Sequence, residues 1–420
     1  MLSQSDSNGA DMIMMANAMN AGGSSGATNK NDSNSNNSSS NQRILTRTES
    51  STQILSSLHS DYIHHVSFDI YGRRMATCSG DRHVRIWNLQ PSGGGTATTA
   101  TTSSSNGTAG EQQQQQDGTT TTTNNNNNNN SSWVVASHFQ AHRGAVTHLS
   151  WSHAEFGTLV ATCGGSDCEV KVWEEQGSHW LVRTNLTDAK KHVTRVEFAP
   201  RHLGLQLATA SADGTCRIYE AVDLQNLGQW PLQGSFQAFS SSGGGGAGIS
   251  CLSWCTGRFE PPTLVVGGST HLAIWRYIAA SRQWTQMSSV QFPKHAGPVL
   301  DVAWAPNVGR RFHWIAATEQ GGPLRVYQLN RLALGLEDEE LELTSTQVLP
   351  SQGPWKCQWN VTGTVLATSG DAGVVQLWKS NPQGEWKCVS QIHGDLPSDV
   401  PGGGVGGGGG GITSDEIMQG

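Results

Sequence analysis

The chain has 420 residues, a formal net charge of −7 and eight cysteines. An acidic protein gains no counterion-release contribution on DNA or RNA, so direct nucleic-acid binding is not expected. The sequence contains no apolar run of the roughly 18 residues that a membrane span needs, and its start lacks the basic and apolar regions of a signal peptide. None of the cysteines forms a Cys-x-x-Cys pair, so we interpret them as reduced, small apolar side chains.

Three segments have compositions that cannot bury enough apolar surface to offset chain entropy. Residues 1–50 are rich in Ser and Asn, residues 91–132 contain Gly, Thr, Gln and Asn runs, and residues 394–420 are rich in Gly. We therefore predict a disordered N-terminal tail, a disordered insert and a disordered C-terminal tail. The remaining part of 51–393 is predicted to form one folded domain.

Six segments of that domain resemble one another, and each opens and closes with an aromatic residue. They span residues 67–87, 150–173, 197–219, 253–275, 303–327 and 358–378. From the second repeat on, successive closing aromatics are 46 to 56 residues apart; the first two are 86 apart, and 42 of these residues belong to the insert. This period is typical of WD repeats, each of which forms one four-stranded blade. The sequence thus predicts an all-β, six-bladed WD-repeat β-propeller.

The pattern within a repeat also predicts the order of its strands. A stretch of small residues, such as 75–78, indicates a strand that is buried on both faces. The alternating stretch that follows, such as 84–87, indicates a half-buried strand, and turn residues separate the two. The insert then falls between the third and fourth strands of blade 1, where a hairpin tip tolerates long insertions at little energetic cost.

WD repeats often carry a hydrogen-bonded network of His, Ser or Thr, Asp and Trp. An Asp about six residues before a closing aromatic recurs in blades 1 to 3, which favours a turn-fixing role over a catalytic Asp–His pair that would need a single copy. The predicted structural network comprises His59, Ser79, Asp81, Trp87, His142, Asp167, Trp173, Ser211, Asp213, Tyr219, Trp275, Tyr327 and Trp378.

No motif for catalysis or cofactor binding was found. The sequence lacks a phosphate-binding glycine loop, a zinc-type His or Cys spacing and a nucleophile elbow. His64 and His65 are adjacent, and adjacent strand residues point to opposite faces, which disfavours joint metal ligation. We therefore expect no catalytic, cofactor-binding or metal-binding residues. The acidic run 337–342 is interpreted as a solvated loop, with an electrostatic docking segment as the alternative.

Several phrases are more specific than a general WD repeat. They are 64–69 and 71–78 in blade 1, 152–157 in blade 2, 198–221 and 226–230 in blade 3, 305–310 in blade 5 and 359–367 in blade 6. Together they resemble the Seh-type nucleoporins, a WD-repeat family whose sister is the Sec-thirteen coat protein. The resemblance covers essentially all of 59–393, and blade 3 is the closest match.

This resemblance implies an open, six-bladed propeller that an α-solenoid nucleoporin of the Nup-eighty-five type completes by inserting its own blade. It implies a non-enzymatic scaffold in the Y-shaped outer ring of the nuclear pore, at the nuclear envelope, that supports protein and mRNA transport. The slot is expected between blades 1 and 6, where Ile54 and Leu55 form either an edge strand or an unstructured lead-in. Six repeats could also close on themselves.

Other functions remain as alternatives. A scaffold of a vacuolar or lysosomal nutrient-signalling complex, or of a vesicle coat, would use the same physics with a different partner. A ubiquitin-ligase substrate receptor often carries Trp-Asp-x-Arg after a closing strand, but here Trp87 is followed by Asn88 and Trp173 by Glu174. An enzyme would need acids, bases or metals converging at loop ends, and no such set is visible, so we predict that the protein is not an enzyme.

Overall fold

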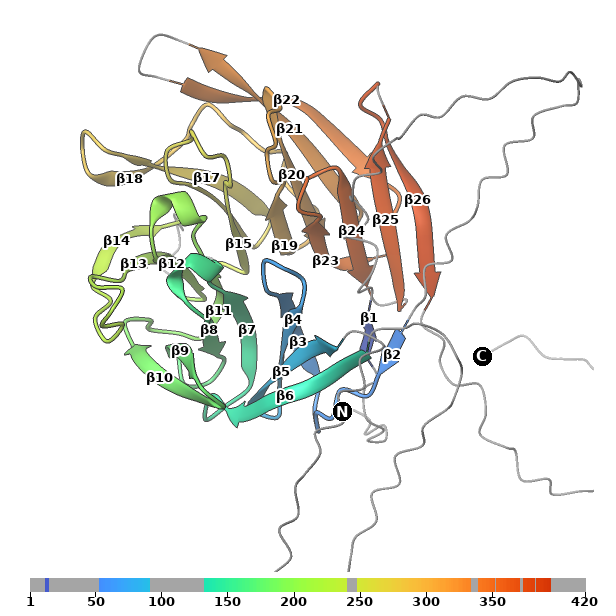
Figure 1. Cartoon of the computed structure of the whole chain (residues 1–420). Helices are drawn as coiled ribbons and strands as arrows, with labels where there is room; N and C mark the ends of the chain where they lie inside the picture. The colour runs from blue at the N-terminus through green and yellow to red at the C-terminus, as the bar shows by residue number, and fades with distance from the viewer. Residues whose placement is uncertain are drawn as a thin grey trace, which may run out of the picture.

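The computed structural model shows a ring of β-sheet blades (Figure 1). It describes residues 12–14, 53–90, 132–239, 248–333, 339–351, 353–370, 373–381 and 383–393. These ranges form six four-stranded antiparallel sheets and one separate two-stranded sheet. Apart from the short 3-10 segments η1 (Ala154–Phe156) and η2 (Arg201–Leu203), the described residues form strands, turns and loops. The predicted all-β, six-bladed propeller is confirmed.

Each blade is built from four strands that are consecutive in sequence. Blade 1 contains β3 (Ile63–Phe68), β4 (Arg74–Ser79), β5 (His83–Gln90) and β6 (Ser132–Gln140). Blade 2 contains β7 (Val146–Trp151), β8 (Leu159–Gly164), β9 (Val170–Gln176) and β10 (His179–Leu186). Blade 3 contains β11 (Val193–Phe198), β12 (Gln206–Ser211), β13 (Thr215–Glu220) and β14 (Leu232–Gln237).

The second half of the chain repeats this arrangement. Blade 4 contains β15 (Cys251–Trp254), β16 (Thr263–Gly268), β17 (His271–Ile278) and β18 (Gln283–Gln286). Blade 5 contains β19 (Val299–Trp304), β20 (Phe312–Glu319), β21 (Leu324–Ala333) and β22 (Glu339–Leu349). Blade 6 contains β23 (Pro354–Trp359), β24 (Val365–Gly370), β25 (Val374–Ser380) and β26 (Trp386–His393). The separate sheet pairs β1 (Met12–Met14) with β2 (Gln53–Leu55).

The three segments expected to be disordered lie almost wholly outside the described residues. Within 1–50 the structure describes only β1, and within 91–132 only Ser132, the first residue of β6. Because β5 ends at Gln90 and pairs with β6, the insert connects the third and fourth strands of blade 1. Within the described ranges, the structure contains no helix of the length and apolarity needed to cross a membrane.

Burial follows the sequence pattern of the repeats. All six residues of β8 and of β16 are buried, as small and β-branched residues permit where neighbouring blades stack closely. Strand β5 alternates between buried and half-buried residues at its start, as expected for a half-buried strand. The core is therefore a series of layers between blades rather than one central mass.

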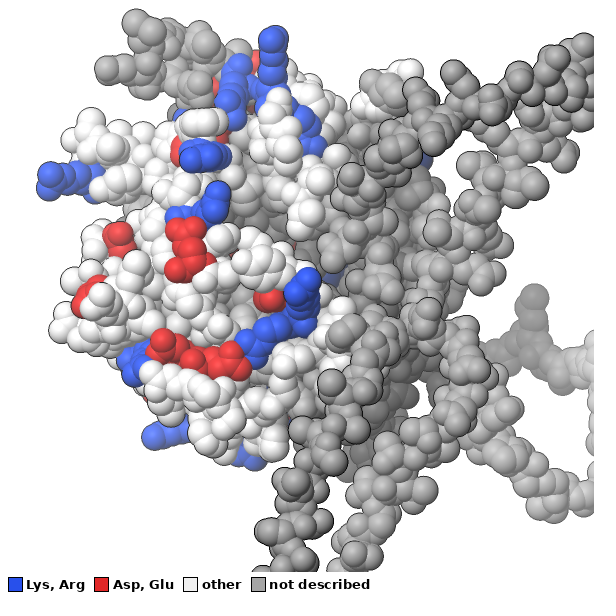
Figure 2. Space-filling view, viewed as in Figure 1, with Lys and Arg blue, Asp and Glu red and all other residues white. Residues whose placement is uncertain are grey.

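Charged side chains on the face shown in Figure 2 lie in small mixed groups rather than in one broad basic patch among the residues drawn in colour. An ion pair links blades 1 and 2, because the guanidinium of Arg74 in β4 lies 2.6 Å from the carboxylate of Glu175 in β9. The Arg74 guanidinium also lies 5.4 Å from the centre of the Trp151 ring. Arg74 thus makes contacts within the propeller.

Two histidines from neighbouring inner strands, the half-buried His65 and the buried His148, lie against each other near the propeller axis. The rings of His65 in β3 and His148 in β7 are 3.7 Å apart, centre to centre. Burial lowers the pKa of both imidazoles well below the ordinary value of 6.5, and the positive charges of Lys356 and Arg195 lower these pKa values further. Both rings are therefore neutral in the folded protein near pH 7.

These two rings make the stability of the propeller sensitive to acid. The histidines of the unfolded state bind protons near pH 6.5, whereas those of the folded state do not. The contribution of the two neutral rings to the free energy of unfolding is therefore fully present above that pH and is lost as the pH falls below it. We expect a slope of up to about 1.4 kcal/mol per pH unit for each histidine. Urea unfolding curves recorded between pH 7.5 and 5 measure this slope.

The matched variant is His148→Leu, which cannot be protonated and fills the same buried position. The variant is expected to flatten the pH dependence relative to the wild type. Glu197 acts in the opposite direction, because burial raises the pKa of its carboxyl group to about 7. Since Glu197 is present in both proteins, the difference between the two curves isolates the histidine. Identical slopes in the two proteins would show that the pair does not titrate on unfolding.

Candidate protein-docking site between blades 1 and 6

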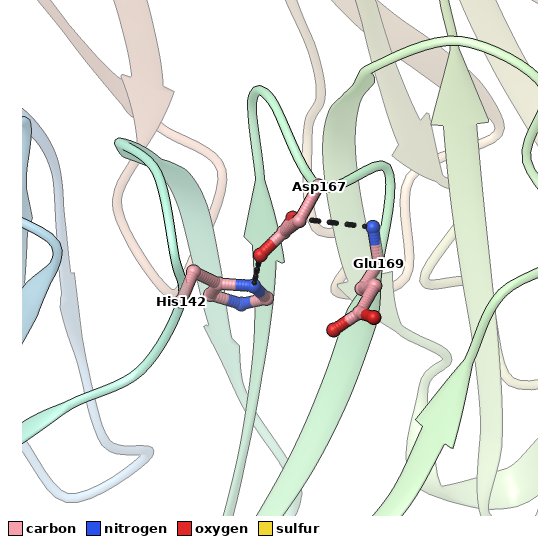
Figure 3. Close-up of side chains that lie close together, drawn as sticks. All are labelled: His142, Asp167 and Glu169. Atoms are coloured by element: carbon pink, nitrogen blue, oxygen red, sulfur yellow. Dashed lines mark hydrogen bonds and ion pairs between the residues drawn. The ribbon is translucent and has the colours of Figure 1, made fainter.

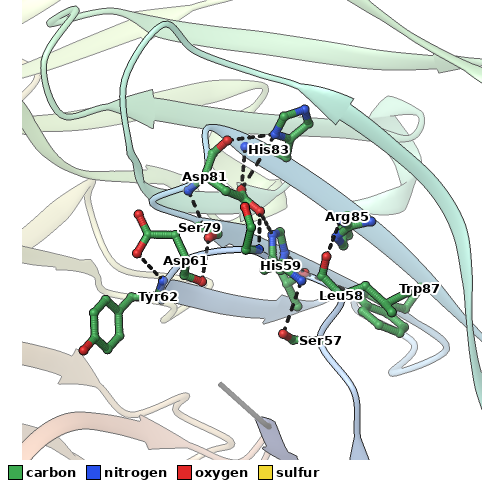
Figure 4. A network of polar contacts seen from close by, with 12 residues as sticks. Ser57, Leu58, His59, Asp61, Tyr62, Ser79, Asp81, His83, Arg85 and Trp87 are labelled. Atoms are coloured by element: carbon green, nitrogen blue, oxygen red, sulfur yellow. Dashed lines mark hydrogen bonds and ion pairs between the residues drawn. The ribbon is translucent and has the colours of Figure 1, made fainter. Parts of the chain in front are cut away.

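Blade 1 contains a continuous hydrogen-bonded network of polar side chains (Figure 4). His59 Nδ1 lies 2.8 Å from the Asp81 carboxylate, and His59 Nε2 lies 2.9 Å from the Thr77 hydroxyl. Trp87 Nε1 donates to the same hydroxyl at 3.1 Å. Because a carboxylate only accepts, His59 Nδ1 carries the proton and donates to Asp81. His59 Nε2 then accepts from the Thr77 hydroxyl, which in turn accepts from Trp87.

The hydroxyl that joins His59 and Trp87 in this network belongs to Thr77, whereas the sequence pattern predicted Ser79. The Ser79 hydroxyl instead accepts from the backbone of Asp81 and donates to the carbonyl of Asp61. Residues 77 and 79 lie on the same face of β4, because side chains in a strand alternate with a period of two. Spacing along the sequence therefore could not decide which hydroxyl meets the histidine.

Blade 2 repeats the arrangement (Figure 3). His142 Nδ1 lies 2.9 Å from Asp167. His142 Nε2 lies 2.9 Å from the Thr162 hydroxyl, and Trp173 Nε1 donates to the same hydroxyl at 2.9 Å. Glu169 lies close to His142 and Asp167, which makes this trio the one described group of His, Cys, Asp and Glu near enough together to hold a metal ion. Both nitrogens of the His142 ring are already hydrogen-bonded, however, so the geometry is that of a turn-fixing network.

The remaining blades keep parts of this chain. In blade 3, Tyr219 donates to Asp188, Asp213 pairs with Arg217, and Ser211 donates to the carbonyl of Lys191. In blade 6, Trp378 donates to Thr368 at 3.0 Å. The prediction for Trp275 in blade 4 was wrong: its buried indole N–H has no hydrogen-bond partner among the described residues, and its ring instead stacks on Phe236 at 4.3 Å.

Blade 5 contains a hydrogen-bonded network of which the sequence analysis identified only one residue. That residue is Tyr327. His295 Nδ1 lies 2.9 Å from the Glu319 carboxylate, and the Tyr327 hydroxyl lies 3.0 Å from His295 Nε2. Glu319 replaces the usual Asp and Tyr327 the usual Trp, so the residue types hid the equivalence. We propose that these networks are structural and fix turns in the blades that carry them.

Removing the central hydroxyl of one network tests this role. We expect Thr162→Val to lower the free energy of unfolding by about 2–3 kcal/mol, because it leaves Trp173 and His142 with unpaired, buried polar atoms. Urea unfolding measures the change. Thr256→Val, at an exposed loop position, is the control and is expected to change stability by less than about 0.5 kcal/mol. Equal effects of the two variants would contradict a structural network.

Hydrogen bonds between inner strands join five pairs of neighbouring blades. They connect Trp151 to Ser67, Phe198 to Ser150, Trp254 to Glu197, Trp304 to Ser253 and Trp359 to Ala303. Five hydrophobic clusters, each shared by two blades, fill the same five junctions. Blades 1 to 6 are thus packed one on the next in chain order.

The sixth junction, between blades 6 and 1, differs. Gln358 of β23 occupies the position equivalent to Ala303 but is exposed, and Trp355 in the same strand is 50% exposed. Strand β24 alternates between buried and half-buried residues, whereas β8 and β16 are buried throughout. The half-buried positions include Val365 and Ala367. Blade 6 therefore buries one face against blade 5 and leaves its other face partly open.

The facing side of blade 1 is apolar. Met75, Trp87 and Trp133 form a buried cluster with Leu55, which is 9% exposed. Every described member of this cluster belongs to blade 1 except Leu55, and none comes from blade 6. The junction thus combines a partly open face on β24 and β25 with an aromatic face on blade 1. A β-sheet of a partner protein can pack between two such faces, because it would cover apolar surface on both.

Comparisons with known proteins agree with this architecture. The model of the WD domain, G-beta repeat, matches residues 51–88, 132–174 and 181–220. Nucleoporin SEH1-A of Xenopus laevis is 34% identical over 362 residues, which cover 80% of this chain and 87% of that protein. Nucleoporin SEH1 of Homo sapiens gives the same identity and coverage.

Among solved structures, a chain from the crystal structure of the mitotic checkpoint complex has a similar fold, with a TM-score of 0.51 and 14% sequence identity. The superposition covers 79% of this chain and 78% of that chain. At that identity the likeness shows the fold alone. The identity to the nucleoporins, by contrast, extends over most of both chains and confirms the resemblance seen in the repeats. The chain therefore belongs to the SEH1 nucleoporin family of WD-repeat proteins.

Proposed function

We propose that this protein is a non-enzymatic scaffold subunit of the outer ring of the nuclear pore. An α-solenoid nucleoporin of the Nup-eighty-five type would dock at the junction between blades 1 and 6 and complete the ring with a blade of its own. The observation that carries this proposal is the burial pattern of β24, which is buried on one face only. Membership of the SEH1 nucleoporin family supports the location at the nuclear envelope.

The physical reason for docking is the cost of leaving this junction unfilled. Val375 and Leu377 are among the half-buried apolar residues on blade 6. Each Å² of such apolar surface that a partner covers contributes roughly 25 cal/mol to the free energy of binding. A strand-bearing partner also satisfies backbone groups at a sheet edge, which loops and helices do less well. Blade insertion is therefore favoured over contact with a helical surface alone.

Affinity purification of the tagged full-length protein, washed in high salt and analysed by mass spectrometry, tests the proposal. Contacts that bury apolar surface survive salt, whereas steering by surface charge is screened. We expect an α-solenoid nucleoporin and further outer-ring subunits to remain bound. Recovery of nutrient-signalling or vesicle-coat subunits alone would assign the same docking site to the alternative scaffold. Recovery of a ligase adaptor, or of no stable partner, would overturn the scaffold function.

A further inference from the structure

The two-stranded sheet of β1 and β2 belongs to no blade. Its register is antiparallel, with Met12 opposite Leu55, Ile13 opposite Ile54 and Met14 opposite Gln53. Leu55, the last residue of β2, packs in the cluster that lines the blade 1 side of the sixth junction. Figure 1 draws the pair beside blade 1 and below the ends of β25 and β26. The pairing of β1 with β2 thus places an N-terminal strand at the proposed docking site.

Strand β2 is held in place from its C-terminal side. Ser57 and His59 follow it directly, and both are buried. The His59 backbone donates to the Ser57 hydroxyl, and its ring joins the polar chain to Asp81 and Thr77 (Figure 4). The position of β2 beside blade 1 is therefore fixed by the same network that closes the blade.

Strand β1 pairs with β2 over three residues, and 38 residues of the sequence separate Met14 from Gln53. A two-stranded sheet of this length is marginally stable in water, and a long connection leaves its strands free to separate at small cost. A competing strand can therefore displace β1 while β2 stays in position.

We propose that β2 is the strand that receives the partner's strand, and that β1 occupies its edge until the partner binds. The occupant favoured by the pairing is an extended segment that runs antiparallel to β2 and carries apolar residues, as the sequence Met-Ile-Met does. The N-terminal segment is then an internal competitor that raises the partner concentration needed for assembly. This inference rests on the proposed function, because it names the strand used at that site.

A disulfide between opposite positions tests the pairing independently of any partner. The variant Ile13→Cys/Ile54→Cys, made with Cys388→Ser to remove the exposed native thiol, is expected to form an intramolecular disulfide on mild oxidation. The control Ile13→Cys/Ser60→Cys, in which the exposed Ser60 is out of register, is expected to stay reduced. Failure of the first pair to cross-link, or equal cross-linking of both, would overturn the pairing.

Binding of the purified α-solenoid nucleoporin tests the competition. Glycines at residues 12, 13 and 14 weaken strand pairing, and we expect them to lower the Kd about threefold to tenfold, since the competent fraction of the protein rises. Glycines at residues 16, 17 and 18 are the matched control and leave the Kd unchanged. The oxidised Ile13→Cys/Ile54→Cys protein is expected to bind at least about tenfold more weakly than its reduced form.

The outcomes separate this inference from the proposed function. If the wild type binds the nucleoporin, but neither the glycine variant nor oxidation changes the Kd, the partner does not use the edge that β1 occupies and the competition is refuted. If the wild type binds no α-solenoid protein at all, the proposed function itself fails, and the disulfide still reports whether β1 and β2 pair.

Discussion

Replacing Asp301 by alanine is expected to lower the free energy of unfolding by about 3–5 kcal/mol. The carboxylate is 2% exposed and lies 2.8 Å from the guanidinium of Arg195, which joins blade 5 to blade 3 near the axis. Its second oxygen accepts from the backbone of Cys357 in blade 6 at 3.1 Å. The variant leaves a buried guanidinium without its counter-charge and a buried amide without its acceptor. Urea unfolding followed by tryptophan fluorescence measures the change.

A double variant separates the ion pair from simple loss of volume. Asp301→Leu combined with Arg195→Met replaces the pair by apolar side chains, and we expect it to be more stable than Asp301→Ala, because the guanidinium that lost its nearest counter-charge is removed as well. A loss of less than about 1 kcal/mol in Asp301→Ala would show that this ion pair does not hold the three blades together. Equal stability of the single and double variants would contradict the charge explanation.

Placing a charge on the open face of blade 6 is expected to abolish partner binding. Leu377→Glu introduces a carboxylate that a docked blade would bury without a partner, so we expect the affinity for the α-solenoid nucleoporin to fall at least about 100-fold. Because Leu377 is only half-buried in the free protein, the free energy of unfolding is expected to change by less than about 1 kcal/mol. Titration with the purified partner measures the affinity.

Leu181→Glu is the matched control, since Leu181 is 43% exposed on β10 of blade 2, away from the sixth junction. The control is expected to bind the partner with unchanged affinity. Retention of binding by Leu377→Glu would place the docking surface elsewhere on the propeller. Equal loss in both variants would indicate a general effect on the fold rather than a local contact.

The sequence by itself determined the fold class, the number of blades and the position of the insert. These features depend on local patterns: runs of small residues, alternation with a period of two and aromatic residues at a regular spacing. It also indicated the polar networks of blades 1 and 2, because each repeat has an Asp six residues before its closing Trp and a His upstream. Local signals of this kind survive in a single sequence.

Only the tertiary structure decided which residues meet across blades. The Arg195–Asp301 pair joins residues 106 positions apart, and β1 pairs with β2 across a segment of Ser, Asn and Gly that carries no periodic signal. The half-buried face of β24 could not be read from its local pattern, because Leu366-Ala367-Thr368-Ser369 has the same small-residue pattern as its buried counterparts. Whether such a strand is covered on one face or two depends on its neighbours, which local sequence does not encode.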